Sequence, residues 1–137
     1  VALPMWLVAR LTPALAVDLP GRLGVACLFV AAGAAVSVAG VLQFRRVRTT
    51  VNPLRPEKAS SLVTTGIFRL TRNPMYLGLL LLLAGWALYL ANILAFLFLP
   101  AFILYMNRFQ IKPEERALMD RFGQKYLEYA SRVNRWI

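Results

Sequence analysis

The chain has no histidine and a single cysteine. Histidine is the commonest general base and a common zinc ligand, so its absence argues against hydrolase triads and zinc sites. Cys27 has no second cysteine with which to form a disulfide or a thiolate metal site. We therefore expect no metal, and we expect Cys27 to be a small buried residue, as free cysteines usually are.

Acidic residues are also scarce, with six Asp and Glu against sixteen Lys and Arg, which gives a formal charge of +10. In a soluble protein this excess would suggest a nucleic-acid partner. Here the basic residues cluster beside apolar segments, where the positive-inside effect and the attraction to anionic headgroups explain them. We expect membrane lipids, and not nucleic acid, as the partners of these charges.

Charged residues of both signs make up only 16% of the 137 residues, whereas apolar residues make up 59%. Soluble domains usually have about 25% charged and about 45–50% apolar residues. The apolar residues come in blocks long enough to span a bilayer. The composition predicts a single all-α, polytopic membrane domain over residues 1–137, with about four transmembrane segments.

The N-terminal part, residues 1–48, reads as transmembrane helices. Residues 2–17 could form a short spanning helix, and Leu23 to Phe44 is a clear span rich in Gly and Ala. Small residues let helix backbones approach closely in lipid, so this helix should pack against others, and it could serve a homodimer. Arg45, Arg46 and Arg48 end the span, which favours the cytoplasmic side for this end.

A polar loop over residues 49–65 contains Pro53 and Pro56, which block a continuous helix. The apolar run that follows, residues 75–109, would be about 52 Å long as one helix, far more than the ~30 Å hydrocarbon core. Two antiparallel segments that meet at Ala91-Asn92 fit better, with Pro100 as a kink in the second. This hairpin returns the chain to the basic side.

A final helix is predicted to begin at Pro113, with Glu114 and Glu115 in its first turn. Apolar residues recur along it at spacings of four, four, three and four, which defines one face. These residues are Leu118, Phe122, Tyr126, Tyr129 and Val133. The helix is therefore expected to be amphipathic, and to lie on the membrane surface or fold back over the polar loop.

Residues 66–78, GIFRLTRNPMYLG, place polar groups at the mouth of a membrane segment. Polar groups cost free energy when they approach hydrocarbon, which suggests that this segment binds a polar ligand. Simpler explanations stand beside that one. Arg69 and Arg72 could only set topology, Tyr76 could be an interfacial anchor, and the acids at 114–115 could only stabilise a helix dipole.

Residues 62–78, LVTTGIFRLTRNPMYLG, resemble the signature of the isoprenylcysteine carboxyl methyltransferase and phospholipid methyltransferase superfamily. The acidic pair at 114–115, followed by aromatic residues and by Arg132-Val133, resembles the tail motif of the same family. The two motifs stand in the right order around a hairpin of the right length. The resemblance covers residues from about 49 to 137, which would form the cofactor-binding catalytic part.

The resemblance implies S-adenosylmethionine as the methyl donor, bound on the cytoplasmic side of a membrane, which would be the inner membrane of a bacterium. It implies a cofactor site made of Gly66, Arg69, Arg72, Asn73, Pro74, Tyr76, Leu77, Gly78, Glu114 and Glu115. It implies catalytic roles for Arg72, Tyr76 and Arg132, with the two arginines near the acceptor. Asn73 departs from the His of the best-known members, which puts a base role at that position in doubt.

The acceptor implied by the resemblance is lipophilic and enters from the bilayer. An isoprenylcysteine-like carboxylate is preferred, with a phospholipid amine or a small thiol as alternatives. Two alternatives without catalysis also stand: a small multi-helix transporter subunit and a structural membrane protein. A proton-coupled carrier usually has a charged residue buried in mid-span, and the segments 23–44 and 75–106 contain none.

Overall fold

The computed structural model describes residues 1–47 and 61–137, and these form helices joined by short turns. The α-helices are α1 (Ala2–Leu11), α2 (Arg22–Arg46), α3 (Pro74–Leu90), α4 (Ile93–Met106), α5 (Lys112–Phe122) and α6 (Gln124–Arg132). Two 3-10 turns, η1 (Pro13–Leu15) and η3 (Gly66–Arg69), and one π-helical turn, η4 (Asn107–Ile111), complete them. Arg48 and the loop prolines at 53 and 56 lie outside the described residues.

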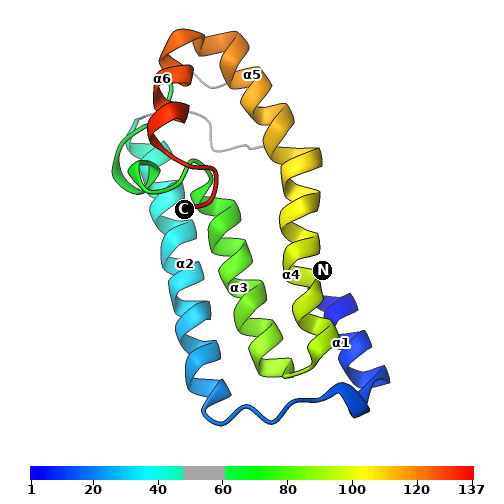
Figure 1. The fold of residues 1–137 in the computed structure, drawn as a ribbon. Helices are drawn as coiled ribbons and strands as arrows, with labels where there is room; N and C mark the ends of the chain where they lie inside the picture. The colour runs from blue at the N-terminus through cyan, green and yellow to red at the C-terminus, as the bar shows by residue number, and fades with distance from the viewer. Residues whose placement is uncertain (48–60) are drawn as a thin grey trace.

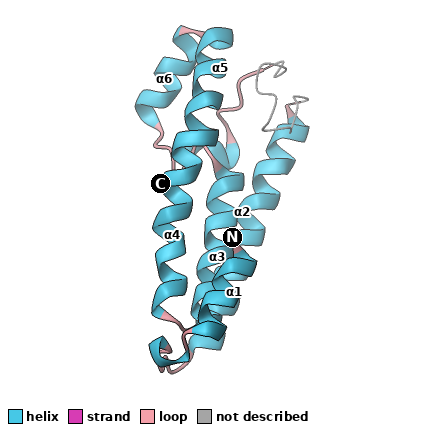
Figure 2. Ribbon diagram, turned by 90° about the vertical axis from the view of Figure 1, so that its right-hand side faces the viewer, coloured by secondary structure: helices cyan, strands magenta, loops and turns pink. Residues whose placement is uncertain are grey.

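Helices α2, α3 and α4 run side by side, and α1 lies beside α4 (Figure 1). Helix α2 ends, α3 begins and α4 ends at the same end of this bundle, where α5 and α6 turn over it (Figures 1 and 2). This end carries the basic residues that flank the helices, among them Arg46, Arg72 and Lys112. We call it the basic end.

The predicted break between the two hairpin helices is confirmed at Ala91 and Asn92. Ala91 adopts the left-handed conformation, with φ of 47°, directly after α3. The buried Asn92 caps α4, because its side-chain oxygen accepts the Leu94 N–H at 3.0 Å. Its amide also donates to the Thr12 carbonyl at 2.9 Å, and Val17 N–H donates to the Ala91 carbonyl at 2.7 Å. The N-terminal segment is thereby tied to the hairpin turn.

The close packing predicted for the Gly/Ala-rich helix is found between α2 and α3. Helix α2 buries Ala26, Gly33 and Gly40, which recur every seven residues along one side. A Cβ added to Gly33 would lie 2.6 Å from the Gly78 carbonyl oxygen, and one added to Gly85 would lie 2.9 Å from the Ala26 carbonyl oxygen. Glycine is needed here because backbone meets backbone.

Cys27 does not share this contact. It is exposed on α2, so the expectation of a buried cysteine was wrong. Only the side of α2 that carries the small residues at 26, 33 and 40 packs against α3, and Cys27 is one residue, or about 100°, out of that register.

Among residues 1–47 and 61–137, buried apolar side chains form two clusters. The first lies among α1, α3, α4 and η4, and its buried members are Met5, Leu83, Ala87, Ala95, Phe102, Met106 and Ile111. The second lies at the basic end, and its buried members are Val63, Phe68, Tyr126 and Tyr129. The second cluster joins η3 to α6, so the tail of the chain packs on the segment that precedes α3.

In the described part of the chain, two helical stretches are long and apolar enough to cross a membrane, Arg22–Arg46 and Ile93–Phe122. Helices α1 and α3 are apolar but shorter, at 10 and 17 residues. Large apolar side chains on the outside of the bundle are exposed, for example Leu28 and Leu104 at 70% each. An apolar exterior of this kind suits a lipid environment.

The prediction of one continuous final helix was wrong, because the chain forms two helices there, α5 and α6. Pro113, Glu114 and Glu115 do lie in the first turn of α5, as predicted, and α4 leads into this helix through the π-helical turn. Helix α5 then ends at Gly123, whose φ of 54° and ψ of −123° favour glycine. The apolar residues predicted to share one face still meet in the basic-end cluster, although they come from two helices.

The glycine contact predicts a stability difference between two glycines of the same helix. Gly33→Ala would place a methyl group against the α3 backbone, which should destabilise the fold by about 1–3 kcal/mol. Gly24→Ala is the matched control, because nothing lies within 4 Å of its added Cβ. Thermal unfolding of both variants in detergent measures the effect. Equal melting temperatures for the two variants would contradict this packing.

Candidate functional site

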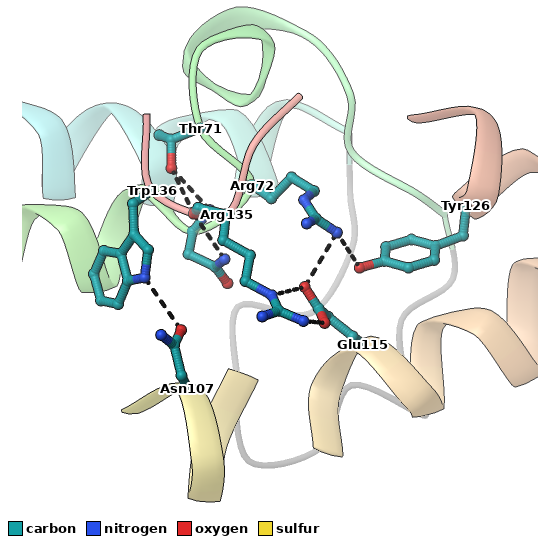
Figure 3. A network of polar contacts seen from close by, with 8 residues as sticks. Thr71, Arg72, Asn107, Glu115, Tyr126, Arg135 and Trp136 are labelled. Atoms are coloured by element: carbon teal, nitrogen blue, oxygen red, sulfur yellow. Dashed lines mark hydrogen bonds and ion pairs between the residues drawn. The ribbon is translucent and has the colours of Figure 1, made fainter. Parts of the chain in front are cut away.

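The site is centred on Glu115, a carboxylate on α5 held by two arginines (Figure 3). Arg135 donates from Nε to Oε1 at 2.8 Å and from Nη2 to Oε2 at 2.7 Å, so it grips both carboxylate oxygens. Arg72 Nη1 lies 3.1 Å from Oε1. A fork of this kind fixes the orientation of a carboxylate as well as its charge. The hydrogen bonds to Glu115 raise the pKa of Arg135 further above its ordinary value.

Arg72, just before α3, also binds α6. Its Nη1 donates to the Tyr126 hydroxyl at 3.0 Å, and its backbone N–H donates to the Asn134 carbonyl at 3.0 Å. Burial raises the pKa of Tyr126, and the negative charge of Glu115 raises it as well, so the hydroxyl stays protonated. Among the described residues, the buried Nε of Arg72 has no hydrogen-bond partner.

Residues Asn134, Arg135 and Trp136 form a C-terminal strap across the start of α3. The Arg135 carbonyl accepts hydrogen bonds from Thr71 Oγ1 at 3.1 Å and from Asn73 Nδ2 at 3.0 Å. Trp136 Nε1 donates to the Asn107 side chain at 3.1 Å, which ties the strap to η4 (Figure 3). The strap therefore fixes the backbone of Arg135, and this holds the base of the Arg135 side chain in one position.

A cavity of about 500 Å³ opens beside this ion cluster, and we call it the strap cavity. It is lined by Arg72, Lys112, Glu115, Arg116, Met119, Asp120, Tyr126, Ala130 and Arg135. Four of these side chains are basic and two are acidic. The walls thus combine an excess of positive charge with carboxylates, which suits a ligand that carries groups of both signs.

A second polar group lies one turn away and contains Tyr76 and Glu114. The Tyr76 hydroxyl donates to Glu114 Oε1, and Gln110 Nε2 donates to the same oxygen at 2.6 Å. Glu114 and Glu115 are adjacent in sequence but have separate partners. The helix-dipole explanation of this pair is therefore incomplete, because each carboxylate has its own hydrogen-bond partners.

A second cavity, of about 400 Å³, lies between η3 and α6, and we call it the η3 cavity. It is lined by Thr64, Thr65, Arg69, Tyr129, Arg132 and Val133. Gly66 lies at the start of η3 with φ of 62°, next to Gln43, whose amide donates to Thr65 Oγ1 at 2.5 Å. Arg69 and Arg132 are exposed, and Arg132 Nε donates to the Glu128 carbonyl at 3.3 Å.

The structure thus divides the predicted site residues among four places. Arg72 and Glu115 meet at the strap cavity, and Asn73 adjoins them through the strap. Tyr76 pairs with Glu114. Arg69 and Arg132 line the η3 cavity, whose lining does not include Arg72, and Gly66 lies at the start of η3. Pro74 and Gly78 are buried where α3 meets α2, and Leu77 is half-buried on α3. The ligand roles of these residues remain predictions.

Three side chains of the site were missed from the sequence: Arg135, Thr71 and the Tyr126 hydroxyl. Tyr126 was assigned only to an apolar face, where its ring does lie. Arg135 stands twenty residues from Glu115, across the reversal at Gly123. No helical spacing predicts such a pair. The only signal was compositional, a basic residue beside a tryptophan near the last residue of the sequence.

Comparison with known proteins assigns the chain to a methyltransferase family. A family model described as phospholipid methyltransferase matches residues 22–125, which is most of the chain, so the chain belongs to that family. The resemblance read from the two motifs is thereby confirmed.

Named relatives agree with this assignment. Protein-S-isoprenylcysteine O-methyltransferase B of Arabidopsis thaliana is 36% identical over 83 residues, which are 58% of this chain and 41% of that protein. A probable protein-S-isoprenylcysteine O-methyltransferase of Oryza sativa subsp. indica is 34% identical over 113 residues, which are 80% of this chain and 58% of that protein. An uncharacterized protein of Haemophilus influenzae is 49% identical over 63 residues, which are 46% of this chain and all of that protein. The chain spans about half the length of the plant relatives.

The hydrogen bond from the buried Tyr129 hydroxyl to the Phe68 carbonyl, at 2.7 Å, predicts that Tyr129→Phe destabilises the protein. The substitution leaves a buried carbonyl unsatisfied, which costs about 1–3 kcal/mol. Tyr89→Phe is the control, because Tyr89 is 51% exposed. Thermal unfolding of the two variants is the measurement. A Tyr129→Phe protein as stable as the control would show that this bond does not hold α6 on η3.

Proposed function

We propose that this chain is an integral membrane methyltransferase that transfers the methyl group of S-adenosylmethionine to a lipophilic acceptor, an isoprenylcysteine-like carboxylate. Membership of the phospholipid methyltransferase family supports the reaction class. The names of the plant relatives support the acceptor. The observation that carries the proposal for this chain is the arginine-bound Glu115 in the wall of the strap cavity.

The residues of the strap cavity fit such a donor. Its volume of about 500 Å³ lies within the range of small-molecule sites, about 300–1,000 Å³. The donor carries a carboxylate, an ammonium and a ribose, and the cavity offers guanidinium, carboxylate and phenol groups toward them.

In the membrane, we place α1, α2, α3 and α4 across the bilayer and the basic end toward the cytoplasm, which in a bacterium is the inner face of the inner membrane. The cluster of basic residues at this end supports the orientation. Helix α3 has 17 residues, about 26 Å in length, so it needs a locally thinned bilayer. Helices α5 and α6 then cover the cytoplasmic mouth of the bundle.

The donor, when bound, supplies a methyl group already activated by a positive sulfur. The chain has to hold and orient the reactants and exclude water. Glu115 accepts hydrogen bonds on both oxygens, so it is an orienting group. A carboxylate or thiolate acceptor needs no strong base, which suits a chain without histidine. An amine acceptor would have to lose a proton, and the hydrogen-bonded pair of Tyr76 and Glu114 is the candidate to take it.

A phospholipid amine or a small thiol is the alternative acceptor, supported by the description of the matching family. A transporter subunit is the alternative outside enzymes. Helices α3 and α4 carry no charged residue, which opposes it.

Loss of either partner in the ion cluster should weaken donor binding. Glu115→Ala and Arg72→Ala are each expected to raise the Kd for S-adenosylmethionine at least tenfold, about 1.4 kcal/mol, in calorimetry on detergent-purified protein. Glu128→Ala, an exposed acid on α6, is the matched control. Wild-type affinity in both variants would return Glu115 and Arg72 to structural roles. No saturable binding by the wild-type protein would remove the enzyme proposal itself.

The acceptor can be identified by methyl transfer. Purified protein with methyl-labelled S-adenosylmethionine is expected to label a species in a membrane extract, released by mild base if the product is a carboxyl methyl ester. Label that stays with a phospholipid headgroup after base treatment would instead support the amine acceptor. A Glu115→Ala protein serves as the control for background labelling.

A further inference from the structure

We propose that Arg135 anchors the carboxylate of an α-amino acid group in the strap cavity, through the guanidinium edge that Glu115 leaves open. This inference deepens the proposed function and rests on it, since the methyl donor carries such a group. Arg135 would thereby make the C-terminal strap part of the binding site, with a carboxylate as the ligand group that it binds.

The Arg135 guanidinium is only partly occupied by its partner Glu115. Glu115 occupies only the edge formed by Nε and Nη2. A guanidinium has five N–H donors in a planar fork, so the edge formed by Nη1 and Nη2 can still donate two parallel hydrogen bonds. Within the described residues, no hydrogen bond engages that second edge. The Arg135 side chain is 36% exposed and lines the strap cavity, so a ligand there can reach it.

The ion cluster around Glu115 carries more positive than negative charge. Two guanidinium groups meet one carboxylate in the cluster of Arg72, Arg135 and Glu115, which leaves a formal excess of one positive charge. Burial of unbalanced charge is unfavourable, and the side chains of Arg72 and Glu115 are only 15% and 18% exposed. One carboxylate from a ligand would neutralise the cluster without any change in the existing ion pairs.

The other three cations of the strap cavity are less suited than Arg135 to bind a carboxylate. Arg72 Nη1 is shared between Glu115 and Tyr126, and its Nε is buried, so its guanidinium is not presented to the cavity as an open fork. Lys112 and Arg116 are exposed on α5. Charges on exposed flexible side chains contribute little to binding, because ordering them costs entropy. Arg135 alone among the four is both orientated by a partner and open to the cavity.

The strap is held in place by hydrogen bonds that do not involve the Arg135 side chain. The Arg135 carbonyl receives hydrogen bonds from Thr71 and Asn73, and the Trp136 side chain is tied to Asn107. These bonds involve the Arg135 backbone and its neighbour, and not the Arg135 side chain. A side-chain substitution should therefore leave the strap in place. A backbone fixed in this way reduces the entropy that a ligand must overcome to order the arginine.

The test compares two ligands on two proteins by calorimetry in detergent. The ligands are S-adenosylhomocysteine and its decarboxylated analogue, S-adenosyl-3-thiopropylamine, which lacks only the carboxylate. Arg135→Gln is expected to raise the Kd for S-adenosylhomocysteine at least tenfold and to change the Kd for the analogue by less than threefold. Arg135→Lys keeps the positive charge but not the planar fork. Its Kd for S-adenosylhomocysteine should lie between those of the wild type and of Arg135→Gln. Arg22→Gln, at the opposite end of α2, is the matched control and should bind both ligands as wild type does.

Each outcome decides the proposal. Unchanged affinity of Arg135→Gln for S-adenosylhomocysteine would overturn it. Equal losses for both ligands would also overturn it, because they would show that Arg135 only maintains the shape of the site through Glu115. A wild-type protein that binds neither ligand nor S-adenosylmethionine would instead reject the proposed function, which distinguishes that failure from the failure of the Arg135 assignment.

Discussion

The contact between α2 and α3 is the constraint on which the rest of the structure depends. In lipid there is no hydrophobic drive to bring two helices together, so they approach only as closely as their side chains allow. Gly33, Gly78 and Gly85 let backbone meet backbone there. That approach fixes how α3 lies against α2, and Arg72 and Asn73 directly precede α3. A shift of α3 along α2 would therefore move both of these residues relative to α5.

The ion cluster at Glu115 then joins three parts of the chain that lie far apart in sequence: the start of α3, the beginning of α5 and the C-terminal strap. Each part is held by another contact as well. Packing on α2 holds α3, the continuous helix from α4 holds α5, and hydrogen bonds to Thr71 and Asn73 hold the strap. A site assembled from supported elements holds its side chains in fixed positions, which suits the proposed methyl transfer, whose main requirement is alignment.

Much of the architecture was predictable from the sequence because it depends on local signals. The hairpin break at Ala91-Asn92 followed from the length of the apolar run, and the close packing of residues 23–44 followed from its small side chains. The two motifs placed Arg72 and Glu115 in one family-level site, and the structure brings them into contact. The tail was predicted less well, because Gly123 was read as a position within a helix and not as its end.

The sequence by itself determined an all-helical chain with apolar spans, a basic end and the motifs of a methyltransferase family, because composition and short-range spacing carry that information. Only the tertiary structure decided which polar residues meet. It placed Arg132 and Arg72 in the linings of two different cavities, gave Glu114 and Glu115 different partners, and brought Arg135 to the site. The physical reason is the reversal at Gly123, which folds the tail back onto the start of α3. Side chains that meet across such a reversal share no helical period.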